Sequence, residues 1–343
     1  MKFSQINFEQ QQKHLKNVSR TFALTIPLLP EELIDYVSNA YLLCRIADTI
    51  EDDPLAAVSK KYSWLQEFYS FCANDFSDDM LLLSLHKRGC ELVKNGAKEC
   101  EFALLEDMPG VIARTRNFPQ KIRAVLSKGV SILSIGMAKS LNGVEIRELI
   151  DVDRYCYFVA GVVGELLAAL FSEFDHRIDK NALMTLSVSF GEGLQLTNIL
   201  KDRAEDRKRN VSFLPPCREE DYKKMVFSYI EICQGHLDDA LDFICLVPAK
   251  DYGIRFFCLL NIAMATATLK VISKADVYSD AKLKISRNKV KLLYCFCKIS
   301  ARSNMLTKFL FRWLSHGIKR IKRNPLTLRN SVSCWNKSIS DIL

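Results

Sequence analysis

Apolar side chains recur three and four positions apart along most of this chain, which is the spacing of an amphipathic helix. The clearest case is the segment from 31 to 52, EELIDYVSNAYLLCRIADTIED, which has Pro30 at its start and Pro54 just after its end. We therefore predict a helix over this segment.

Two other segments carry the same pattern. One begins near Asp151 or Asp153, both acceptable N-caps, and continues through YCYFVAGVVGELLAALFSEF. Its apolar residues cover nearly every face, so we expect it to be deeply buried. The other extends from about 179 to 207 and ends before Pro215 and Pro216. Further helices are predicted at 61–73, 78–95, 121–140, 220–245, 252–273 and 288–323. Few stretches alternate as strands do, so the predicted fold class is all-α.

No segment has the composition of a linker. The chain has 13 Gly and 9 Pro in 343 residues, and no Ser-, Pro- or Gly-rich stretch separates the helical segments. We predict one large domain over residues 1–300, followed by a basic tail over residues 301–343.

The sequence predicts neither secretion nor a membrane span. Every apolar run of 18 or more residues is interrupted by a charged residue. The longest apolar stretch, 256–269, ends at Lys270. The opening residues MKFSQINFEQ lack the apolar centre of a signal peptide. We expect a cytoplasmic protein without a C-terminal membrane anchor.

Cysteine and histidine are dispersed. The twelve cysteines are scattered through a long chain without a secretion signal, so we expect reduced, mostly buried thiols. The five histidines, at 14, 86, 176, 236 and 316, are widely separated, and no CxxC pair occurs. Sequence spacing therefore does not predict a zinc site.

Basic residues accumulate near the C-terminus. The net charge is +8, yet residues 281–340 contain 15 Lys and Arg and no acid, which leaves 33 basic and 40 acidic residues elsewhere. Within this tail, residues 306–323 mix Phe309, Phe311 and Trp313 with basic residues. We hypothesise peripheral contact with an anionic membrane surface; a terminal helix docked on the domain is the alternative. Nothing resembles a nucleic-acid recognition module, so we expect no nucleic-acid partner.

Two groups of acids carry the most chemical information. Asp48, Glu51 and Asp52 stand at i, i+3 and i+4, which places three carboxylates on one face of a helix. The spacing recurs in Asp202, Glu205 and Asp206. Carboxylates held so close repel one another, so the group favours a cation. Oxygen ligands without His or Cys suit Mg²⁺, which commonly bridges carboxylates to substrate phosphates.

A single cluster of this kind is more often a solvated helix end, but two copies favour a metal site. Polar residues extend each cluster with helical spacing, namely Tyr41 and Arg45 before the first and Gln195 and Asn198 before the second. Such stripes in apolar helices are expected to line a cavity. Nearby basic residues, among them Arg20, Arg45, Lys201 and Arg203, suit a diphosphate leaving group, although salt bridges to the acids explain some of them.

Small residues occur between the acidic helices. VAGVVG, at 159–164, contains Ala160, Gly161 and Gly164, which allow another helix or an apolar ligand to approach the backbone; helix packing is the commoner cause. Tyr155, one turn upstream, either presents a hydroxyl or ring face to a carbocation or is a buried structural tyrosine.

Four motifs together resemble the squalene/phytoene synthase family. They are SRTFA at 19–23, YLLCRIADTIEDD at 41–53, YCYFVAGVVG at 155–164 and LQLTNILKDRAED at 194–206. The resemblance covers roughly residues 15–295 and implies a single domain of the all-α isoprenoid synthase fold, with helices surrounding a central apolar cavity. The DTIEDD form of the first acidic motif and the segments 256–269 and 283–293 are most similar to the squalene-forming members.

The resemblance also implies an activity. This is the head-to-head condensation of two farnesyl diphosphates to presqualene diphosphate, followed by NADPH-dependent reduction to squalene. Dehydrosqualene, hydroxysqualene or phytoene are the alternative products. A non-catalytic family relative that serves as an assembly factor is the alternative of a different class.

By match to the motifs, the six clustered acids would bind Mg²⁺ and diphosphate. Asp48, Asp52, Asp202 and Asp206 would be catalytic, and Tyr155 would assist cation or proton chemistry. The substrate sites would be lined by Ser19, Arg20, Phe22, Tyr41, Arg45, Val159, Gly161, Gln195, Asn198 and Lys201.

This chain departs from the family pattern at two positions. Lys201 stands where the family usually has Arg, which retains the charge but loses bidentate geometry. Val211 stands where an Arg is usual in RNVSFLPP, at 209–216, which changes the contacts expected for NADPH and diphosphate at that loop.

Overall fold

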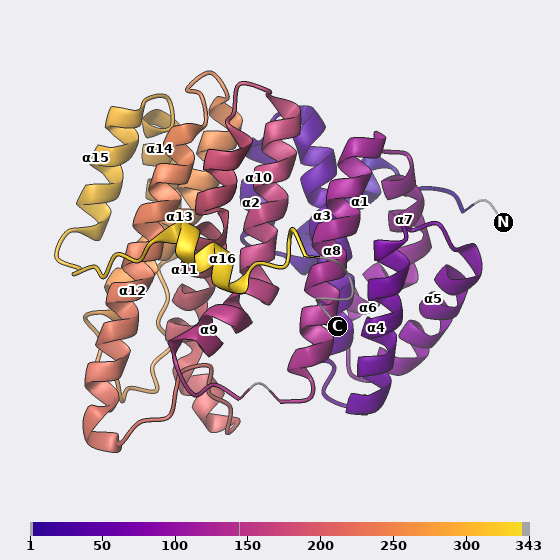
Figure 1. Cartoon of the computed structure of the whole chain (residues 1–343), viewed down its shortest axis with the longest axis horizontal. Helices are drawn as coiled ribbons and strands as arrows, with labels where there is room; N and C mark the ends of the chain where they lie inside the picture. Colours follow the sequence, from indigo (N-terminus) through magenta and orange to yellow (C-terminus); the bar gives the residue numbers. More distant parts are fainter. Residues whose placement is uncertain (1–2, 144, 338–343) are drawn as a thin grey trace. The chain divides into compact units, whose positions relative to one another are not determined.

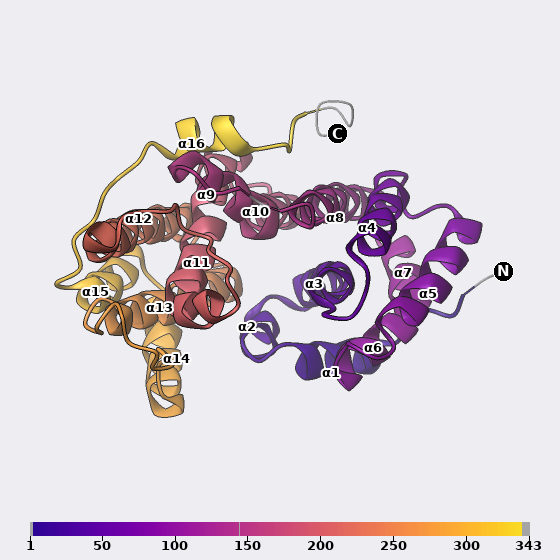
Figure 2. The ribbon, with the colours of Figure 1, turned by 90° about the horizontal axis from the view of Figure 1, so that it is seen from below.

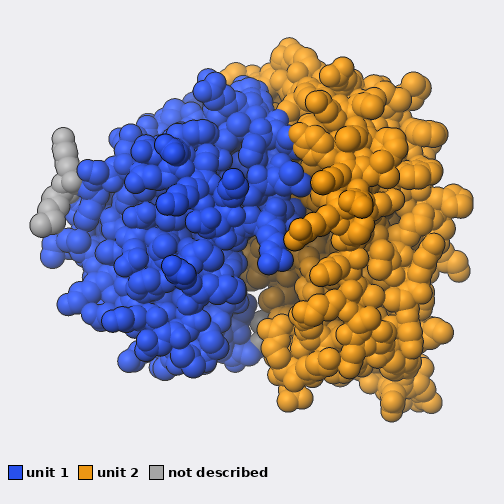
Figure 3. Space-filling view, turned by 180° about the vertical axis from the view of Figure 1, so that it is seen from behind, with its two compact units in different colours: residues 1–144, 169–174, 334–343 blue, residues 145–168, 175–333 orange. Residues whose placement is uncertain are grey.

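The computed structural model describes residues 3–143 and 145–337, and no residue in these ranges lies in a strand (Figure 1). The all-α prediction is therefore confirmed. The chain divides into two compact units, which Figure 3 shows in different colours. Unit 1 comprises residues 1–144, 169–174 and 334–343, and unit 2 comprises residues 145–168 and 175–333. The single domain over 1–300 and its central cavity remain predictions.

Unit 1 is built around α3 (Glu31–Asp52), whose bounds are those predicted from the sequence. Its other helices are α1 (Phe8–Val18), α2 (Phe22–Thr25), η1 (Ile26–Leu28), α4 (Val58–Ala73), α5 (Asp79–Val93), α6 (Glu99–Glu106), α7 (Met108–Arg116) and α8 (Gln120–Ser140). Helix α3 packs against α1, α4, α6, α7 and α8, which lie around it in Figure 2. Because apolar side chains occupy several faces of α3, its polar stripe is the only face with side chains that could bind a metal or a substrate.

Unit 2 is built around α11 (Lys180–Lys208). Its other elements are α9 (Leu149–Cys156), the π-helical segment η2 (Tyr157–Gly161), the start of α10 (Val162–Phe174), α12 (Glu219–Leu246), α13 (Tyr252–Ile272), α14 (Arg287–Ser300), α15 (Asn304–Ser315) and α16 (Pro325–Val332). Helix α11 contacts α9, η2, α12, α13 and α16. It therefore forms the core of this unit.

Close packing explains the small residues of VAGVVG. A Cβ atom added to Gly164 would lie 2.0 Å from the carbonyl oxygen of Ser187, and one added to Gly191 would lie 2.1 Å from that of Ala160. The backbones of α10 and η2 thus touch that of α11 directly. This supports helix packing, the commoner of the two explanations, for Gly164.

The predicted helix over 288–323 is wrong in its extent. It is interrupted after α14, because Ser303 accepts a hydrogen bond from the backbone N–H of Met305 and starts α15 as a new helix. Gly317, with φ of +85°, follows the end of α15, and residues 316–324 are not helical. The short helices α1, α2, α6, α7 and α16 were not predicted. In α7, Pro109 stands in the first turn, a position that is compatible with a helix.

Two helical stretches in the described residues are long and apolar enough to cross a membrane, Leu149–Phe174 and Tyr252–Ile272. The protein buries 72% and 83% of their most apolar windows. The deep burial predicted for the first stretch is thus confirmed, and both have the environment of core helices.

Candidate active site

The first acidic cluster occupies the last turn of α3 in unit 1. Arg45 reaches it from one turn earlier, with Nη1 3.4 Å from Oδ2 of Asp48, and also pairs with Glu101 of α6. The Asp48 side chain keeps 32% of its surface exposed, so its carboxylate is partly accessible to solvent. Glu51 is half-buried and Asp52 is exposed.

Burial and mutual repulsion disfavour the charged forms of these acids. Burial, opposed by Arg45, raises the pKa of Asp48 to about 7. Burial, together with Asp48 and Asp52, raises the pKa of Glu51 to about 8. Partial desolvation by the surrounding protein also raises the pKa of Asp52, although its side chain still reaches solvent. Three carboxyl groups on one helix face with raised pKa values are the environment that a divalent cation would stabilise.

A buried lysine caps the C-terminus of α3, next to this cluster. Lys61 of α4 donates hydrogen bonds from Nζ to the carbonyl oxygens of Glu51, at 2.6 Å, and Asp53, at 3.0 Å. It thereby satisfies carbonyl groups that a helix C-terminus leaves without a partner. Sequence reasoning missed Lys61 and Glu101, because both lie outside α3 and only tertiary packing brings them to it.

Three predicted substrate residues come together near α3. The Ser19 hydroxyl accepts a hydrogen bond of 3.0 Å from the backbone N–H of Phe22 and also bonds to Tyr41. The rings of Phe22 and Tyr41 have centroids 5.3 Å apart. Arg20, which lies between Ser19 and Phe22 in the sequence, is exposed. The SRTFA motif therefore lies against the polar stripe of α3.

The second acidic cluster lies near the end of α11 in unit 2, and each acid has a basic partner. Lys201 lies 3.2 Å from Asp202, Lys282 lies 2.7 Å from Glu205, and Arg209 lies 3.0 Å from Asp206. Lys282 lowers the pKa of the exposed Glu205, whereas burial raises the pKa of Asp206. Lys282, from the loop before α14, was not predicted, because nearly 80 residues separate it from its acid.

Other predicted residues lie on the same part of unit 2. Lys201 Nζ donates a hydrogen bond of 3.0 Å to the side-chain oxygen of Asn198, which is exposed. Gln195 and Val159 are half-buried and Gly161 is buried. Asn198 and Lys201 thus form a polar pair, with Asn198 one turn before the cluster and Lys201 directly beside it.

Tyr155 stacks on the loop that departs from the family pattern. Its ring and that of Phe213 have centroids 4.5 Å apart and planes inclined by 18°. Phe213 also lines a pocket of about 330 Å³ together with Arg203, Asp206, Arg207 and Tyr222. The loop therefore connects Tyr155 to an arginine-lined pocket beside the second cluster.

Comparison with known proteins identifies the family. The family model described as squalene/phytoene synthase matches residues 15–289. The chain belongs to the squalene/phytoene synthase family. It is 30% identical over 275 residues to the squalene synthase of Rattus norvegicus, covering 75% of this chain and 62% of that protein. It is 26% identical over 347 residues to the squalene synthase of Schizosaccharomyces pombe, covering 93% and 71%. The chain thus spans about three fifths of the mammalian relatives that it matches.

Solved structures share the fold. The complex of TcSQS with the ligand E5700 superposes with a TM-score of 0.73 at 22% identity, covering 94% of this chain and 96% of that chain. A dehydrosqualene synthase in complex with a ligand gives a TM-score of 0.57 at 19% identity, covering 85% and 95%. This squalene/phytoene synthase family member therefore has the helical fold of both.

Proposed function

We propose that this protein condenses two molecules of farnesyl diphosphate head to head to presqualene diphosphate and reduces that product to squalene with NADPH. The observation that carries the proposal is the paired set of acids at i, i+3 and i+4, one set on α3 and one on α11, in a member of this family. Each set offers only carboxylate oxygens, which is the donor type that Mg²⁺ prefers. When bound, Mg²⁺ would neutralise a diphosphate and promote its departure.

The chain's own residues fit the ionisation of an allylic diphosphate. Arg45 and Lys201 stand beside the acids of the two clusters, where they would stabilise the leaving diphosphate. Tyr155, held by stacking on Phe213, would present its ring or hydroxyl to the carbocation that remains. The arginine-lined pocket beside Phe213 is where we place the NADPH phosphate groups.

Product analysis tests this function. Purified protein is incubated with farnesyl diphosphate and Mg²⁺, with and without NADPH, and the products are identified by mass spectrometry. We expect presqualene diphosphate without NADPH and squalene with it. Dehydrosqualene or hydroxysqualene in both reactions would leave the condensation intact but remove the reductive step, and a product that requires the twenty-carbon substrate would refute the assignment.

The metal ligands are tested by single substitutions. Asp48→Asn and Asp202→Asn should each abolish turnover, because each removes a Mg²⁺ ligand, while the far-ultraviolet circular dichroism stays unchanged. Glu91→Gln, at an exposed acid of α5, is the matched control and should keep full turnover. Full activity in either cluster variant would contradict the mechanism and favour the non-catalytic relative.

We also propose that α14 and α15 form a peripheral membrane-contact surface. Helix α15 packs on α12 and α13 and buries Leu310, Phe311 and Leu314, so the tail docks on unit 2. Its other face leaves apolar residues in solvent, with Phe309 71% and Trp313 51% exposed. Further exposed apolar residues on the two helices are Leu292, Phe296, Ile299 and Met305. Basic residues accompany them throughout, which suits anionic lipid headgroups.

Vesicle flotation tests this surface. The double variant Phe309→Ser/Trp313→Ser should lose binding to vesicles that contain phosphatidylserine. Met80→Ser, which removes an equally exposed apolar residue (76%) from α5, should not. Equal flotation of wild type and double variant would refute the membrane surface.

A further inference from the structure

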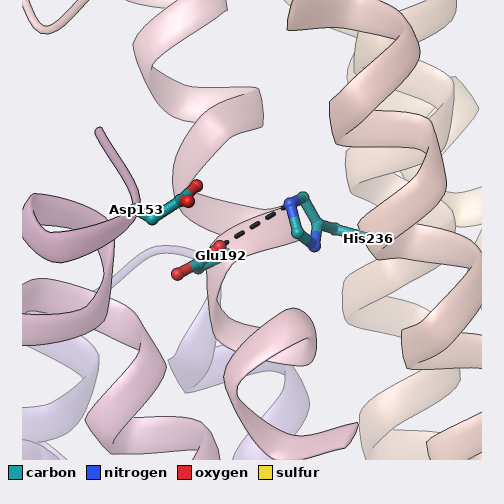
Figure 4. Close-up of side chains that lie close together, drawn as sticks. All are labelled: Asp153, Glu192 and His236. Carbon is teal, nitrogen blue, oxygen red and sulfur yellow. Dashed lines mark ion pairs between the residues drawn. The ribbon is translucent and has the colours of Figure 1, made fainter. Parts of the chain in front are cut away.

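A second group of possible metal ligands lies inside unit 2, away from its acidic cluster in the sequence and in a different environment. Asp153 of α9, Glu192 of α11 and His236 of α12 each place a ligand atom within 4.8 Å of the others, and all three residues are buried (Figure 4). Because the three residues come from three helices, no local sequence pattern predicts the group. A solvated helix end cannot explain it.

Two of these side chains lack the partners that buried polar groups normally have. Both carboxylate oxygens of Glu192 and Nε2 of His236 are buried without a hydrogen bond to any described residue. Nε2 lies 3.6 Å from Oε2 of Glu192, as the dashed line in Figure 4 marks, which is longer than a hydrogen bond. Leaving such groups buried and unsatisfied destabilises a fold. A group that does not belong to the chain is therefore expected between them.

The observed separation fits a shared cation. In a tetrahedral zinc site with ligand distances of about 2.1 Å, neighbouring ligand atoms lie about 3.4 Å apart. The 3.6 Å between Glu192 and His236 is close to that value. A histidine nitrogen with two carboxylate oxygens is a donor set that suits Zn²⁺, with a water as the fourth ligand, better than Mg²⁺.

The surroundings hold the imidazole in the form that binds metals. Burial, assisted by Arg323, lowers the pKa of His236 to about 3, so the ring is neutral. Its other nitrogen, Nδ1, lies 3.4 Å from the hydroxyl of Ser189, which in turn bonds to Asp239. An oriented second nitrogen of this kind is typical of histidine ligands.

Arg323 offsets one of the two carboxylate charges in the group, so one negative charge remains for a cation. It donates two hydrogen bonds of 2.6 Å to Asp153 and so compensates one of the two carboxylates. A divalent cation would add to a site that otherwise contains one arginine and two acids. Each Asp153 oxygen has a second lone pair that remains for a metal.

We propose that Asp153, Glu192 and His236 bind one zinc-like divalent cation that ties α9, α11 and α12 together within unit 2. Of the helices that the cation would join, α9 carries Tyr155 two residues after Asp153, and α11 carries the second acidic cluster ten residues after Glu192. The cation would fix these helices relative to each other. The inference stands on this geometry and does not depend on the proposed prenyl transfer.

The test measures metal content and does not use activity. Full-length protein is loaded with ZnCl₂ in the presence of excess Mg²⁺, which occupies the two acidic clusters, then desalted, and zinc is measured by mass spectrometry. We expect about one zinc per chain in wild type and in Asp202→Asn, and about tenfold weaker retention in Glu192→Gln and His236→Gln. Equal zinc in wild type and these two variants, or none in folded wild type, would overturn the proposal.

X-ray absorption at the zinc edge of the wild-type protein provides a second measurement that does not depend on the variants folding. We expect a first shell of nitrogen and oxygen only. The chain has twelve free thiols, two of which, Cys156 and Cys233, are buried in the same helices. A first shell that contains sulfur would assign the zinc to cysteines and refute the site.

Discussion

Arg323 donates two hydrogen bonds of 2.6 Å to the carboxylate oxygens of Asp153, which stands 170 positions earlier and is only 1% exposed. Arg323 belongs to the non-helical stretch between α15 and α16. This stretch also bonds to α12, where the backbone N–H of Ile321 donates to the carbonyl of Glu231 at 2.9 Å. The C-terminal segment is therefore tied into the core of unit 2 by a buried ion pair.

Removing the arginine should destabilise the protein. Arg323→Gln leaves the buried Asp153 carboxylate without compensation, and we expect a loss of about 3 kcal/mol in the free energy of unfolding. Arg320→Gln is the matched control. Arg320 also pairs with an acid, Asp238, but its own side chain is 42% exposed, so we expect less than about 1 kcal/mol. Urea denaturation followed by circular dichroism measures the free energy of unfolding of both variants. Equal losses would show that the Arg323–Asp153 pair contributes no more to stability than the Arg320–Asp238 pair.

Lys61 is expected to position the first acidic cluster. Lys61→Met removes the donor that holds the carbonyl oxygens of Glu51 and Asp53, so the last turn of α3 should loosen. We expect the Mg²⁺ concentration for half-maximal turnover to rise about tenfold, with a smaller change in maximal rate. Lys60→Met, at the exposed neighbouring position, should change neither quantity. A fall in maximal rate alone, with no change in Mg²⁺ dependence, would argue against a positioning role.

The raised pKa values of the first cluster predict a pH-dependent stability. Burial raises the pKa of Asp48 to about 7 and that of Glu51 to about 8, so the folded protein holds protons that the unfolded chain has already released. Without Mg²⁺, stability from these groups therefore falls as pH rises from about 4 to about 8. Bound Mg²⁺ should reverse this loss, so that its effect on the melting temperature is larger near pH 8 than near pH 5.

Differential scanning fluorimetry across this pH range, with and without Mg²⁺, measures the effect. Asp48→Asn/Glu51→Gln cannot titrate at either position, so we expect it to lose most of the pH-dependent Mg²⁺ stabilisation. Identical Mg²⁺ effects in the double variant and wild type would show that the second cluster, or another site, accounts for the binding.

The contact between α10 and α11 leaves no room for a side chain. In Gly164→Ala the new methyl group meets the backbone of Ser187, which cannot move as a side chain can, so we expect a loss of about 1–3 kcal/mol. Gly193→Ala is the control, because the nearest atom there is the side-chain end of Leu237 at 3.0 Å. That substitution should cost less, since alanine also favours the helix. A comparable loss in both would remove the argument from close backbone approach.

Residue spacing along the chain was enough to predict the helical class, the bounds of α3 and the shared helix face of the acids in each cluster. Each depends on spacing along one helix, where residues three and four apart share a face whatever packs against them. Short elements such as α6 and α7 escaped prediction, because eight or nine residues give little periodicity and Pro109 is equally compatible with a loop.

Which residues from other helices contact these faces could be seen only in the tertiary structure. Lys282 and Arg323 pair with acids that lie 77 and 170 positions away, and Lys61 bonds to the backbone carbonyl of a residue 10 positions away. His236 lies beside Glu192 only because α12 packs on α11. The periodicity of a segment predicts that its helix has a polar face, but it does not predict which other helix packs against that face. The packing of apolar surfaces elsewhere on the helices determines that partner and so brings the polar groups together.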